Sequence, residues 1–387
     1  MTMFNKVSKF LSVLLLALFT VQAHAVARLI PAEPQIAASA YLVMDADTGK
    51  VIAAKNADKP FAPASLTKMM TAYILEYELG KGNVSEDDLV LVSEKAWRTQ
   101  GSRMFIREGT QVRLGDLMKG IVIQSGNDAS VAAAEHIAGS EAAFADLMNQ
   151  HADLLGMKNT TFHNATGLPS DGHVSSAHDL AVLAQAIIQD YPGHYGMYSE
   201  KYFTYNKIRQ PNRNKLLWRD KTVDGLKTGY TEAAGYCLVA SAKRDGMRLI
   251  SVVLGTKDEE ARARESQKLL SYAFRYYRTH KLYDQGVMLN TTKLWAGVKD
   301  QLQIGIDESL SVTIPRGQAD KLQATMDVDR VIKAPVAKGQ QLGQVRVTLD
   351  GELVTEVPLV ALEAVPEAGL LKRIWHAILL FFTSFFG

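Results

Sequence analysis

The stretch that decides the fold reads Pro63-Ala64-Ser65-Leu66-Thr67-Lys68-Met69-Met70, which places a serine three residues before a lysine. Prolines before the serine predict an extended approach, and the apolar run after it predicts a buried helix to about Tyr77. Residues three apart share one face of a helix, so the Ser65 hydroxyl and the Lys68 amine are expected to meet. The stretch therefore offers a nucleophile and a base within one helical turn.

The chemistry of this pair depends on the charge of Lys68, because a protonated amine cannot accept a proton. Burial and the positive end of a helix both lower the pKa of a lysine, so a buried Lys68 can be neutral often enough to activate Ser65. The N–H groups of a first helical turn lack helical partners, which leaves the Ser65 N–H free to face an oxyanion. The alternative interpretation is an N-capping serine followed by a surface lysine.

Length and composition bound the class of protein. The 387 residues predict two or three domains with ample material for a large core. A formal net charge of +2 with mixed signs gives no case for a nucleic-acid partner. Cys237 is the single cysteine, so no intramolecular disulfide can form, and its apolar surroundings in the sequence predict a buried thiol.

Residues 1–25 read as a secretory signal peptide. Lys6 and Lys9 precede an apolar stretch that is too short to span a bilayer, and Ala23-His24-Ala25 offers a cleavage site of small residues. No cysteine lies near this site, which argues against a lipoprotein signal. We therefore expect an exported protein whose mature chain starts near Val26.

The pattern of residues 26–281 predicts an α+β catalytic domain. Residues 39–55 read as a hairpin, and strands on either side of Asp245-Gly246 predict a second hairpin over 235–254. Between the hairpins the pattern is helical from about 113 to 190, and a charged amphipathic helix is expected over 258–280. Strands that enclose a helical insertion indicate an antiparallel sheet with helices on its faces.

The sequence pattern changes after residue 281. Residues 282–365 carry short alternating strands and turns, which predict a small all-β domain without catalytic residues, used as a spacer or docking module. Residues 366–387 form a separate C-terminal segment.

Two further motifs turn the Ser65 stretch into a site. Gln124-Ser125-Gly126-Asn127-Asp128 closes an apolar run and can present a hydroxyl beside an amide, although a helix cap would look the same. Asp224-Gly225-Leu226-Lys227-Thr228-Gly229-Tyr230 can project a cation and a hydroxyl, and its second glycine allows a substrate backbone to approach; a surface strand edge is the alternative. In order, Ser-x-x-Lys, Ser-x-Asn and Lys-Thr-Gly match the set found in penicillin-binding proteins and serine β-lactamases.

The sequence resembles the low-molecular-mass penicillin-binding proteins of the five and six type, which are D-alanyl-D-alanine carboxypeptidases of the Ser-x-x-Lys acyl-transferases. The resemblance covers nearly the whole chain, including the three motifs, Ala234-Gly235-Tyr236, Arg264-Glu265-Ser266, Thr313-Ile314-Pro315-Arg316-Gly317 and the aromatic C-terminus. It implies a β-lactamase/transpeptidase-like catalytic domain, then a β-rich domain, then an amphipathic anchor. Tyr230 departs from the family pattern, which often has histidine after Lys-Thr-Gly.

The resemblance also implies a mechanism. Ser65, deprotonated by Lys68, would attack the carbonyl of the penultimate D-alanine of a peptidoglycan stem pentapeptide, and the N–H groups of Ser65 and Tyr230 would hold the oxyanion. Ser125, in contact with Lys68 and Lys227, would pass a proton to the departing amine. Water activated by Lys68 would then release the acyl group.

The same resemblance assigns the substrate contacts. Asn127 would hold the substrate amide, and Thr228 with a cation would hold the terminal carboxylate; Arg262 fits the family's arginine position better than its neighbour Arg264. Penicillins and other β-lactams would acylate Ser65 and leave slowly. No metal or organic cofactor is expected, and the activity would serve cell wall biogenesis and cell shape.

Three rival functions are open at this point. A β-lactamase carries the same three motifs, but no convincing glutamate loop for fast deacylation is present. A Ser-His-Asp hydrolase could recruit one of several histidines, although no Gly-x-Ser-x-Gly elbow accompanies them; the candidates are His136, His163, His173 and His178. A catalytically weak, wall-binding scaffold is the third possibility, and the intact motifs argue against it.

The C-terminal segment, residues 366–387, predicts an amphipathic helix. Its large apolar residues fall mostly on one helical side, away from Lys372 and Arg373: they are Leu371, Ile374, Trp375, Ile378, Phe381, Phe382 and Phe385. Crossing a bilayer needs about 20 apolar residues, and the uncharged run from Ala377 is far shorter. We therefore expect peripheral attachment to the periplasmic face of the inner membrane, with helix docking on the β domain as the alternative.

Overall fold

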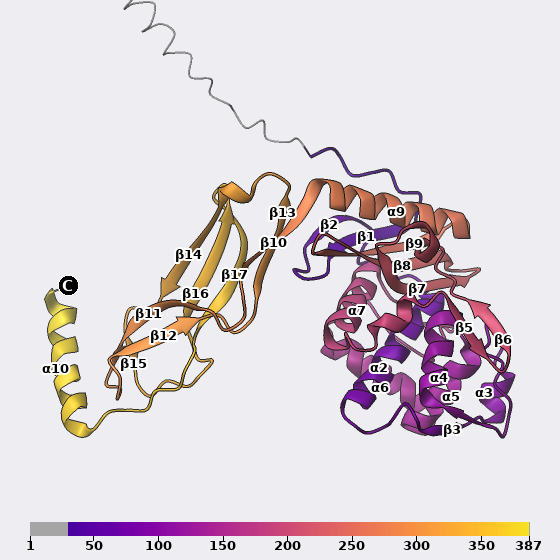
Figure 1. Cartoon of the computed structure of the whole chain (residues 1–387), viewed down its shortest axis with the longest axis horizontal. Helices are drawn as coiled ribbons and strands as arrows, with labels where there is room; N and C mark the ends of the chain where they lie inside the picture. Colours follow the sequence, from indigo (N-terminus) through magenta and orange to yellow (C-terminus); the bar gives the residue numbers. More distant parts are fainter. Residues whose placement is uncertain (1–29, 387) are drawn as a thin grey trace, which may run out of the picture. The chain divides into compact units, whose positions relative to one another are not determined.

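The computed structural model describes residues 30–386 (Figure 1). The predicted signal peptide, residues 1–25, lies outside the described residues. The α+β arrangement expected from the sequence is observed, with a sheet-and-helix region followed by an all-β region.

A five-stranded antiparallel sheet organises the first region. Its strand order is β2-β1-β9-β8-β7, formed by β1 (Ala40–Asp45), β2 (Val51–Lys55), β7 (Val223–Thr231), β8 (Gly235–Arg244) and β9 (Met247–Thr256). Both predicted hairpins are confirmed. Asp245 and Gly246 have φ of 48° and 84°, and a two-residue hairpin loop of this hand follows the twist of its strands.

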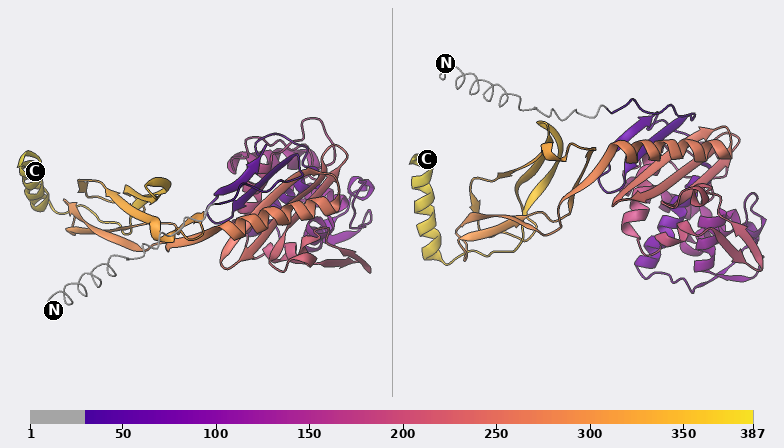
Figure 2. Two further views of the ribbon diagram at one scale, coloured as in Figure 1. Left: turned by 90° about the horizontal axis from the view of Figure 1, so that it is seen from above. Right: turned by 45° about the horizontal axis from the view of Figure 1, so that its top comes forward.

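The two faces of this sheet bury two separate apolar cores. On β1, Leu42 and Met44 face one core while Tyr41 and Val43 face the other, because successive side chains of a strand alternate. Helix α9 (Glu259–Tyr276) covers the second face, and most of the remaining helices lie against the first (Figures 1 and 2).

The helical insertion holds the first two of the three motifs, while Lys-Thr-Gly lies on β7. It contains the 3₁₀ turn η1 (Ala64–Thr67), α2 (Lys68–Gly80), α3 (Glu94–Arg98), α4 (Leu114–Lys119), the π-helical turn η2 (Gly120–Gln124), α5 (Asn127–Ala138), α6 (Glu141–Leu154) and α7 (Ala177–Asp190). The predicted helical region is thus interrupted by an irregular segment over 155–176. Smaller elements are β3 (Leu89–Leu91), β4 (Gln111–Arg113), η3 (Tyr195–Ser199), β5 (Tyr202–Tyr205), β6 (Ile208–Pro211) and α8 (Leu216–Arg219).

The helix expected over 258–280 is too long. Helix α9 ends at Tyr276, and strand β10 (Tyr277–Tyr283) begins at once and pairs with β13 (Leu310–Pro315). Aromatic and β-branched residues at the start of β10 favour a strand. The apolar periodicity that predicted the helix gives no sign of this change of backbone conformation. Strand β10 therefore runs across the expected domain boundary at residue 281.

The all-β region contains a six-stranded sheet of order β14-β16-β17-β12-β11-β15. The strands are β11 (Met288–Trp295), β12 (Gln301–Gly305), β14 (Leu322–Val328), β15 (Ile332–Lys333), β16 (Gln341–Leu349) and β17 (Glu352–Ala361), and η4 (Ala319–Lys321) precedes β14. The region has its own apolar core, to which β13 also contributes.

Helix α10 (Leu370–Phe386) closes the described chain. Its first half is tied to the β11–β12 connection: His376 Nδ1 accepts a hydrogen bond from the Ala296 N–H at 2.8 Å, and Lys372 pairs with Asp300 at 2.8 Å. Many of its large apolar side chains are exposed, including Leu371 and Trp375. Within residues 30–386, no helix has the length and apolar character required to cross a bilayer.

Candidate active site

The nucleophile turn is tighter than the helix expected from the sequence. Ser65 lies in η1, a 3₁₀ turn, and the α-helix begins only at Lys68. The turn packs directly on strand β7: a Cβ added at Gly229 would lie 3.0 Å from the Pro63 carbonyl oxygen. Gly229 therefore lets the nucleophile turn approach the strand closely.

Lys68 is positioned to act on Ser65. Its Nζ donates hydrogen bonds to Ser65 Oγ at 3.0 Å and to the Thr166 carbonyl oxygen at 2.6 Å. The side chain is buried, and this burial, with a contribution from the positive charge of Arg213, lowers the pKa of Lys68 from 10.5 to about 7, while Asp128 acts to raise that pKa. Near neutral pH a large share of the Lys68 amines is thus unprotonated and able to accept a proton.

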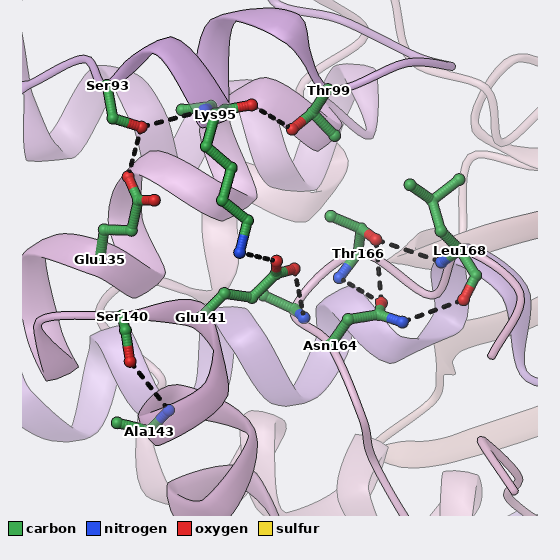
Figure 3. Close-up of polar contacts among 12 residues, drawn as sticks. Ser93, Lys95, Thr99, Glu135, Ser140, Glu141, Ala143, Asn164, Thr166 and Leu168 are labelled. Atoms are coloured by element: carbon green, nitrogen blue, oxygen red, sulfur yellow. Dashed lines mark hydrogen bonds and ion pairs between the residues drawn. The ribbon is translucent and has the colours of Figure 1, made fainter. Parts of the chain in front are cut away.

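The carbonyl that receives Lys68 belongs to a turn built around Asn164 (Figure 3). Asn164 Oδ1 accepts hydrogen bonds from the N–H groups of Thr166 and Gly167 at 3.1 and 2.7 Å, and its amide donates to the Leu168 carbonyl at 3.0 Å. An asparagine can fold a turn around its own side chain in this way. The turn fixes the direction of the Thr166 carbonyl.

The same turn is held from both sides. Glu141 on α6 accepts a hydrogen bond from the Ala165 N–H at 3.2 Å and pairs with Lys95 on α3 at 2.8 Å (Figure 3). Thr71 on α2 donates to the Ala165 carbonyl at 2.7 Å. Helices α6 and α2 therefore hold the segment next to Lys68, and Lys95 on α3 supports Glu141 in turn. No sequence motif indicated this support.

Ser125 occupies a left-handed position, with φ of 67°, directly after the π-helical turn η2. Next to it, Asn127 donates its side-chain amide to the Gln100 carbonyl at 2.6 Å, and its backbone N–H donates to the Ser102 carbonyl at 2.7 Å. The segment 100–103 is thus hydrogen-bonded to the second motif. Asn127 Oδ1 is buried and has no hydrogen-bond partner among the described residues, so it is available to a ligand.

Lys227 lies buried on β7 and donates to the Thr228 carbonyl at 3.1 Å. Burial lowers the pKa of Lys227 well below its ordinary value, and the nearby charge of Lys68 acts in the same direction. The expected contact of Ser125 with the two lysines is not a hydrogen bond, because the buried Ser125 hydroxyl has no such partner within residues 30–386. That hydroxyl therefore remains free to bond with a substrate.

Two arginines from distant segments line the site. Arg262 on α9 is buried and donates to the Gly229 carbonyl at 3.3 Å, whereas the neighbouring Arg264 pairs with Glu265 at 2.9 Å outside the pocket. Arg213 also lines the pocket, although it belongs to none of the sequence motifs. The only sequence feature that could have indicated Arg213 is its position between two asparagines. One of them, Asn214, fixes the segment by donating a hydrogen bond to the Gly225 carbonyl at 2.7 Å.

These side chains surround one pocket of about 430 Å³. The sequence-predicted residues that line it are Ser65, Ser125, Asn127, Thr228, Gly229, Tyr230 and Arg262, while Lys68 and Lys227 lie buried beside it. Other lining residues are Gly101, Ser102, Thr166, Gly167, Leu168, Arg213, Thr231, Tyr236 and Glu259. The ring of Tyr230 is half exposed and packs on Tyr236 with ring centroids 4.3 Å apart.

The histidines proposed for a Ser-His-Asp hydrolase do not meet Ser65. None of the four lines the described pocket. His136 and His178 approach surface carboxylates, and the backbone N–H of His163 donates to His173 Nδ1 at 3.1 Å. His173 Nε2 lies 2.8 Å from Thr67 Oγ1, so this imidazole supports the nucleophile turn from behind. The base that the geometry offers to Ser65 is therefore a lysine.

A serine and a buried lysine at hydrogen-bond distance, in a sheet-and-helix domain, define a serine hydrolase of the acyl-enzyme type with a lysine base. Comparison with known proteins gives the family. Residues 27–258 match the family described as D-alanyl-D-alanine carboxypeptidase, and residues 277–367 match the family described as penicillin-binding protein 5, C-terminal domain. The chain belongs to the D-alanyl-D-alanine carboxypeptidase family of serine peptidases.

Individual relatives cover almost the whole chain. The D-alanyl-D-alanine carboxypeptidase DacC of Escherichia coli is 44% identical over 92% of this chain and 90% of its own length. The D-alanyl-D-alanine carboxypeptidase DacA of Haemophilus influenzae is 41% identical over 92% of each chain. Among solved structures, penicillin-binding protein 5 of Haemophilus influenzae superposes with a TM-score of 0.83 at 41% identity, covering 87% of this chain and all of that one.

Proposed function

We propose that Ser65 is the nucleophile and Lys68 the general base of a D-alanyl-D-alanine carboxypeptidase that trims peptidoglycan stem pentapeptides. The observation that carries this proposal is the 3.0 Å approach of Lys68 Nζ to Ser65 Oγ, made by a lysine whose pKa is lowered to about 7. Ser65 Oγ attacks the carbonyl carbon of the penultimate D-alanine, and Lys68 takes the hydroxyl proton. The backbone N–H groups of Ser65 and Tyr230 receive the oxyanion, each contributing about 3 kcal/mol in comparable sites.

The second half of the reaction uses the remaining polar groups. Ser125, with its unpaired hydroxyl, passes its proton to the amine of the departing D-alanine and takes in return the proton that Lys68 accepted from Ser65, which leaves Lys68 neutral again. Lys227 lies on the same strand as Thr228. Asn127 Oδ1 accepts from the substrate amide, for which it has no competing partner in the described chain. Water, deprotonated by Lys68, then attacks the acyl-enzyme and frees Ser65.

The direct test is to incubate the purified protein with a soluble stem pentapeptide and to measure released D-alanine. We expect one D-alanine to be released per pentapeptide over many turnovers, because the enzyme is regenerated after each cycle. Absence of release by a folded protein that still binds labelled penicillin would reject the carboxypeptidase assignment and would favour a binding role.

β-lactam antibiotics are expected to acylate the same serine. Relatives crystallised with these drugs include penicillin-binding protein D2 of Listeria monocytogenes in its ampicillin-bound and cefotaxime-bound forms, both 32% identical over 63% of this chain. Their TM-scores of 0.58 and 0.59 support a shared catalytic fold. We infer that a β-lactam carbonyl occupies the position of the D-alanine carbonyl and leaves Ser65 slowly.

The cations of the pocket are proposed to read the terminal carboxylate of the substrate. Arg262→Ala or Lys227→Ala should lower kcat/KM for a peptide ending in a free carboxylate by about 10- to 100-fold, because a charge-assisted hydrogen bond is lost. The loss on a C-terminally amidated analogue should be much smaller. Arg264→Ala is the matched control, since Arg264 lies on the same helix outside the pocket. Equal losses on both peptides would show that these cations shape the site without reading the carboxylate.

We propose further that the protein is exported and rests on the periplasmic face of the inner membrane through α10. Its exposed apolar residues include Leu371, Trp375, Phe381 and Phe382, between 54% and 84% accessible. Burying such side chains in lipid at about 25 cal/mol per Å² amounts to several kcal/mol, which is the main contribution, because Lys372 and Arg373 are paired with Asp300 and Glu367.

Removal of α10 is therefore expected to release the enzyme from membranes. A stop codon after Gly369 deletes the helix while keeping the Ala368 N–H bond to the Ala296 carbonyl at 2.8 Å. The truncated chain should move from the membrane pellet to the soluble fraction and retain full activity on small peptides. A full-length chain with Leu371, Trp375 and Phe382 replaced by serine is the matched control and should behave in the same way. Pelleting of both variants with membranes would place the attachment elsewhere.

A further inference from the structure

Two large aromatic side chains outside the pocket are strongly exposed and contact each other. Tyr202 on β5 is 43% accessible and Trp218 on α8 is 42% accessible. Their ring centroids lie 5.9 Å apart at an interplanar angle of 84°, so the rings form two perpendicular walls. Exposed apolar clusters rimmed by polar groups mark interaction sites more often than isolated exposed residues do.

Two cations stand over these rings. The Arg209 guanidinium lies 3.8 Å from the centroid of Tyr202, and Lys201 Nζ lies 5.9 Å from that of Trp218. Neither cation forms an ion pair in the part of the chain that the structure describes, whereas Lys215 and Arg219 in the same segment pair with glutamates of α9. We call Lys201, Tyr202, Arg209 and Trp218 the ring corner.

The charge of this segment is one-sided. Residues 201–221 contain seven lysines and arginines and one acidic residue, Asp220. Lys215 and Arg219 are neutralised by glutamates of α9, so the positive charge left unpaired at the ring corner is that of Lys201 and Arg209, which attracts anionic polymers.

The ring corner is connected to the catalytic pocket. On strand β6, Gln210 Nε2 donates to the Arg103 carbonyl at 3.1 Å, and the adjacent Ser102 lines the pocket. Between β6 and α8 the chain carries Arg213 into the pocket. Strand β7, which holds Lys-Thr-Gly, is an edge of the main sheet and follows α8 in the chain.

We propose that the ring corner binds a second stretch of the peptidoglycan polymer whose stem peptide occupies the pocket. Sugar rings have apolar C–H faces that pack on exposed aromatic side chains, and stem peptides carry free carboxylates that Lys201 and Arg209 attract. This inference rests on the proposed function, because the polymer is the one that the pocket acts on. It predicts a preference for polymeric over soluble substrate that the catalytic residues alone do not provide.

The test compares one enzyme on two substrates. A full-length chain with Tyr202→Ser and Trp218→Ala, purified in detergent, should release D-alanine from a soluble pentapeptide at a rate within about twofold of the unsubstituted chain, while its rate on insoluble sacculi falls about tenfold, since two aromatic contacts are lost. Its co-sedimentation with sacculi already trimmed of terminal D-alanine should weaken in parallel, because the pocket then has no substrate.

A second variant guards against misfolding. Lys201→Gln with Arg209→Gln leaves both rings in place and should weaken sedimentation with sacculi severalfold, with a smaller salt dependence. Controls are Leu154→Ala for exposed apolar area and Lys243→Gln for charge, both at exposed positions outside the ring corner.

The outcomes distinguish failure of the proposed function from failure of the ring corner proposal. If the unsubstituted chain releases no D-alanine from the pentapeptide, the proposed function fails. If it does, and the ring variants treat sacculi as the unsubstituted chain does, the ring corner proposal alone is overturned. A loss confined to the charge variant at low salt also overturns it, since general electrostatic attraction would then suffice.

Discussion

Replacing Ser65 by alanine should abolish both covalent labelling by penicillin and release of D-alanine, with a fall in kcat of roughly 10⁴-fold or more. In the proposed mechanism Ser65 Oγ forms the acyl bond, and the alanine variant has no atom to replace it. The neighbouring lysine and the oxyanion donors cannot compensate, because they stabilise a tetrahedral intermediate that no longer forms. Labelling followed by gel electrophoresis and mass spectrometry measures the adduct directly.

The control for this experiment is Ser102→Ala. Ser102 lines the same pocket, and its carbonyl receives the Asn127 N–H, a bond that alanine retains. This variant should keep its label and most of its activity. Label retained at full stoichiometry by Ser65→Ala would assign the nucleophile to another residue and would remove the basis of the mechanism.

Local sequence patterns predicted most of the sheet and its helical insertion. The hairpin turn at Asp245-Gly246 was recognisable because both of its positions require positive φ, which few residue pairs favour. The nucleophile pair was recognisable because its spacing is local, and 3.0 Å between Lys68 Nζ and Ser65 Oγ follows from one turn of chain.

What the sequence could not provide are the contacts between distant segments. Arg213 reaches the pocket although it belongs to none of the three motifs, and its effect on the pKa of Lys68 acts through space. The turn around Asn164 is equally hidden, since an asparagine before Ala-Thr-Gly is common in loops. This turn orients the Thr166 carbonyl so that it accepts a hydrogen bond from Lys68.

The burial of Glu76 could not be predicted from the sequence pattern either. It lies within the apolar run that predicted helix α2, and a charged residue in such a run is expected at the surface. The structure instead buries it, with one carboxylate oxygen accepting a hydrogen bond from the Tyr198 hydroxyl at 3.4 Å and the other unpaired among the described residues. Burial raises the pKa of Glu76 to about 8, so this carboxyl group is largely protonated at neutral pH.

The charge state of Lys68 gives the second large prediction. With its pKa near 7, the base form grows as pH rises through neutrality, so kcat/KM for acylation should increase with pH and level off above about pH 8. Arg213→Gln removes a positive charge that lowers this pKa, and the acid limb of the profile should therefore move to higher pH by about one unit. Replacing Asp128, which raises the pKa of Lys68, is not a clean test of a shift to lower pH. Its carboxylate also accepts hydrogen bonds from the N–H groups of Met104 and Phe105, and the replacement would remove them.

Whether Lys68 acts as a base or only as a fixed charge is decided by two substitutions. Lys68→Ala should lower acylation by roughly 10⁴-fold, because general-base assistance is lost. Lys68→Arg keeps a positive charge on a side chain that stays protonated at every accessible pH, so it should be as inactive as the alanine variant. Substantial acylation by Lys68→Arg would show that a cation at this position suffices, and proton transfer from Ser65 would then have to reach another group, such as Lys227, whose pKa burial also lowers.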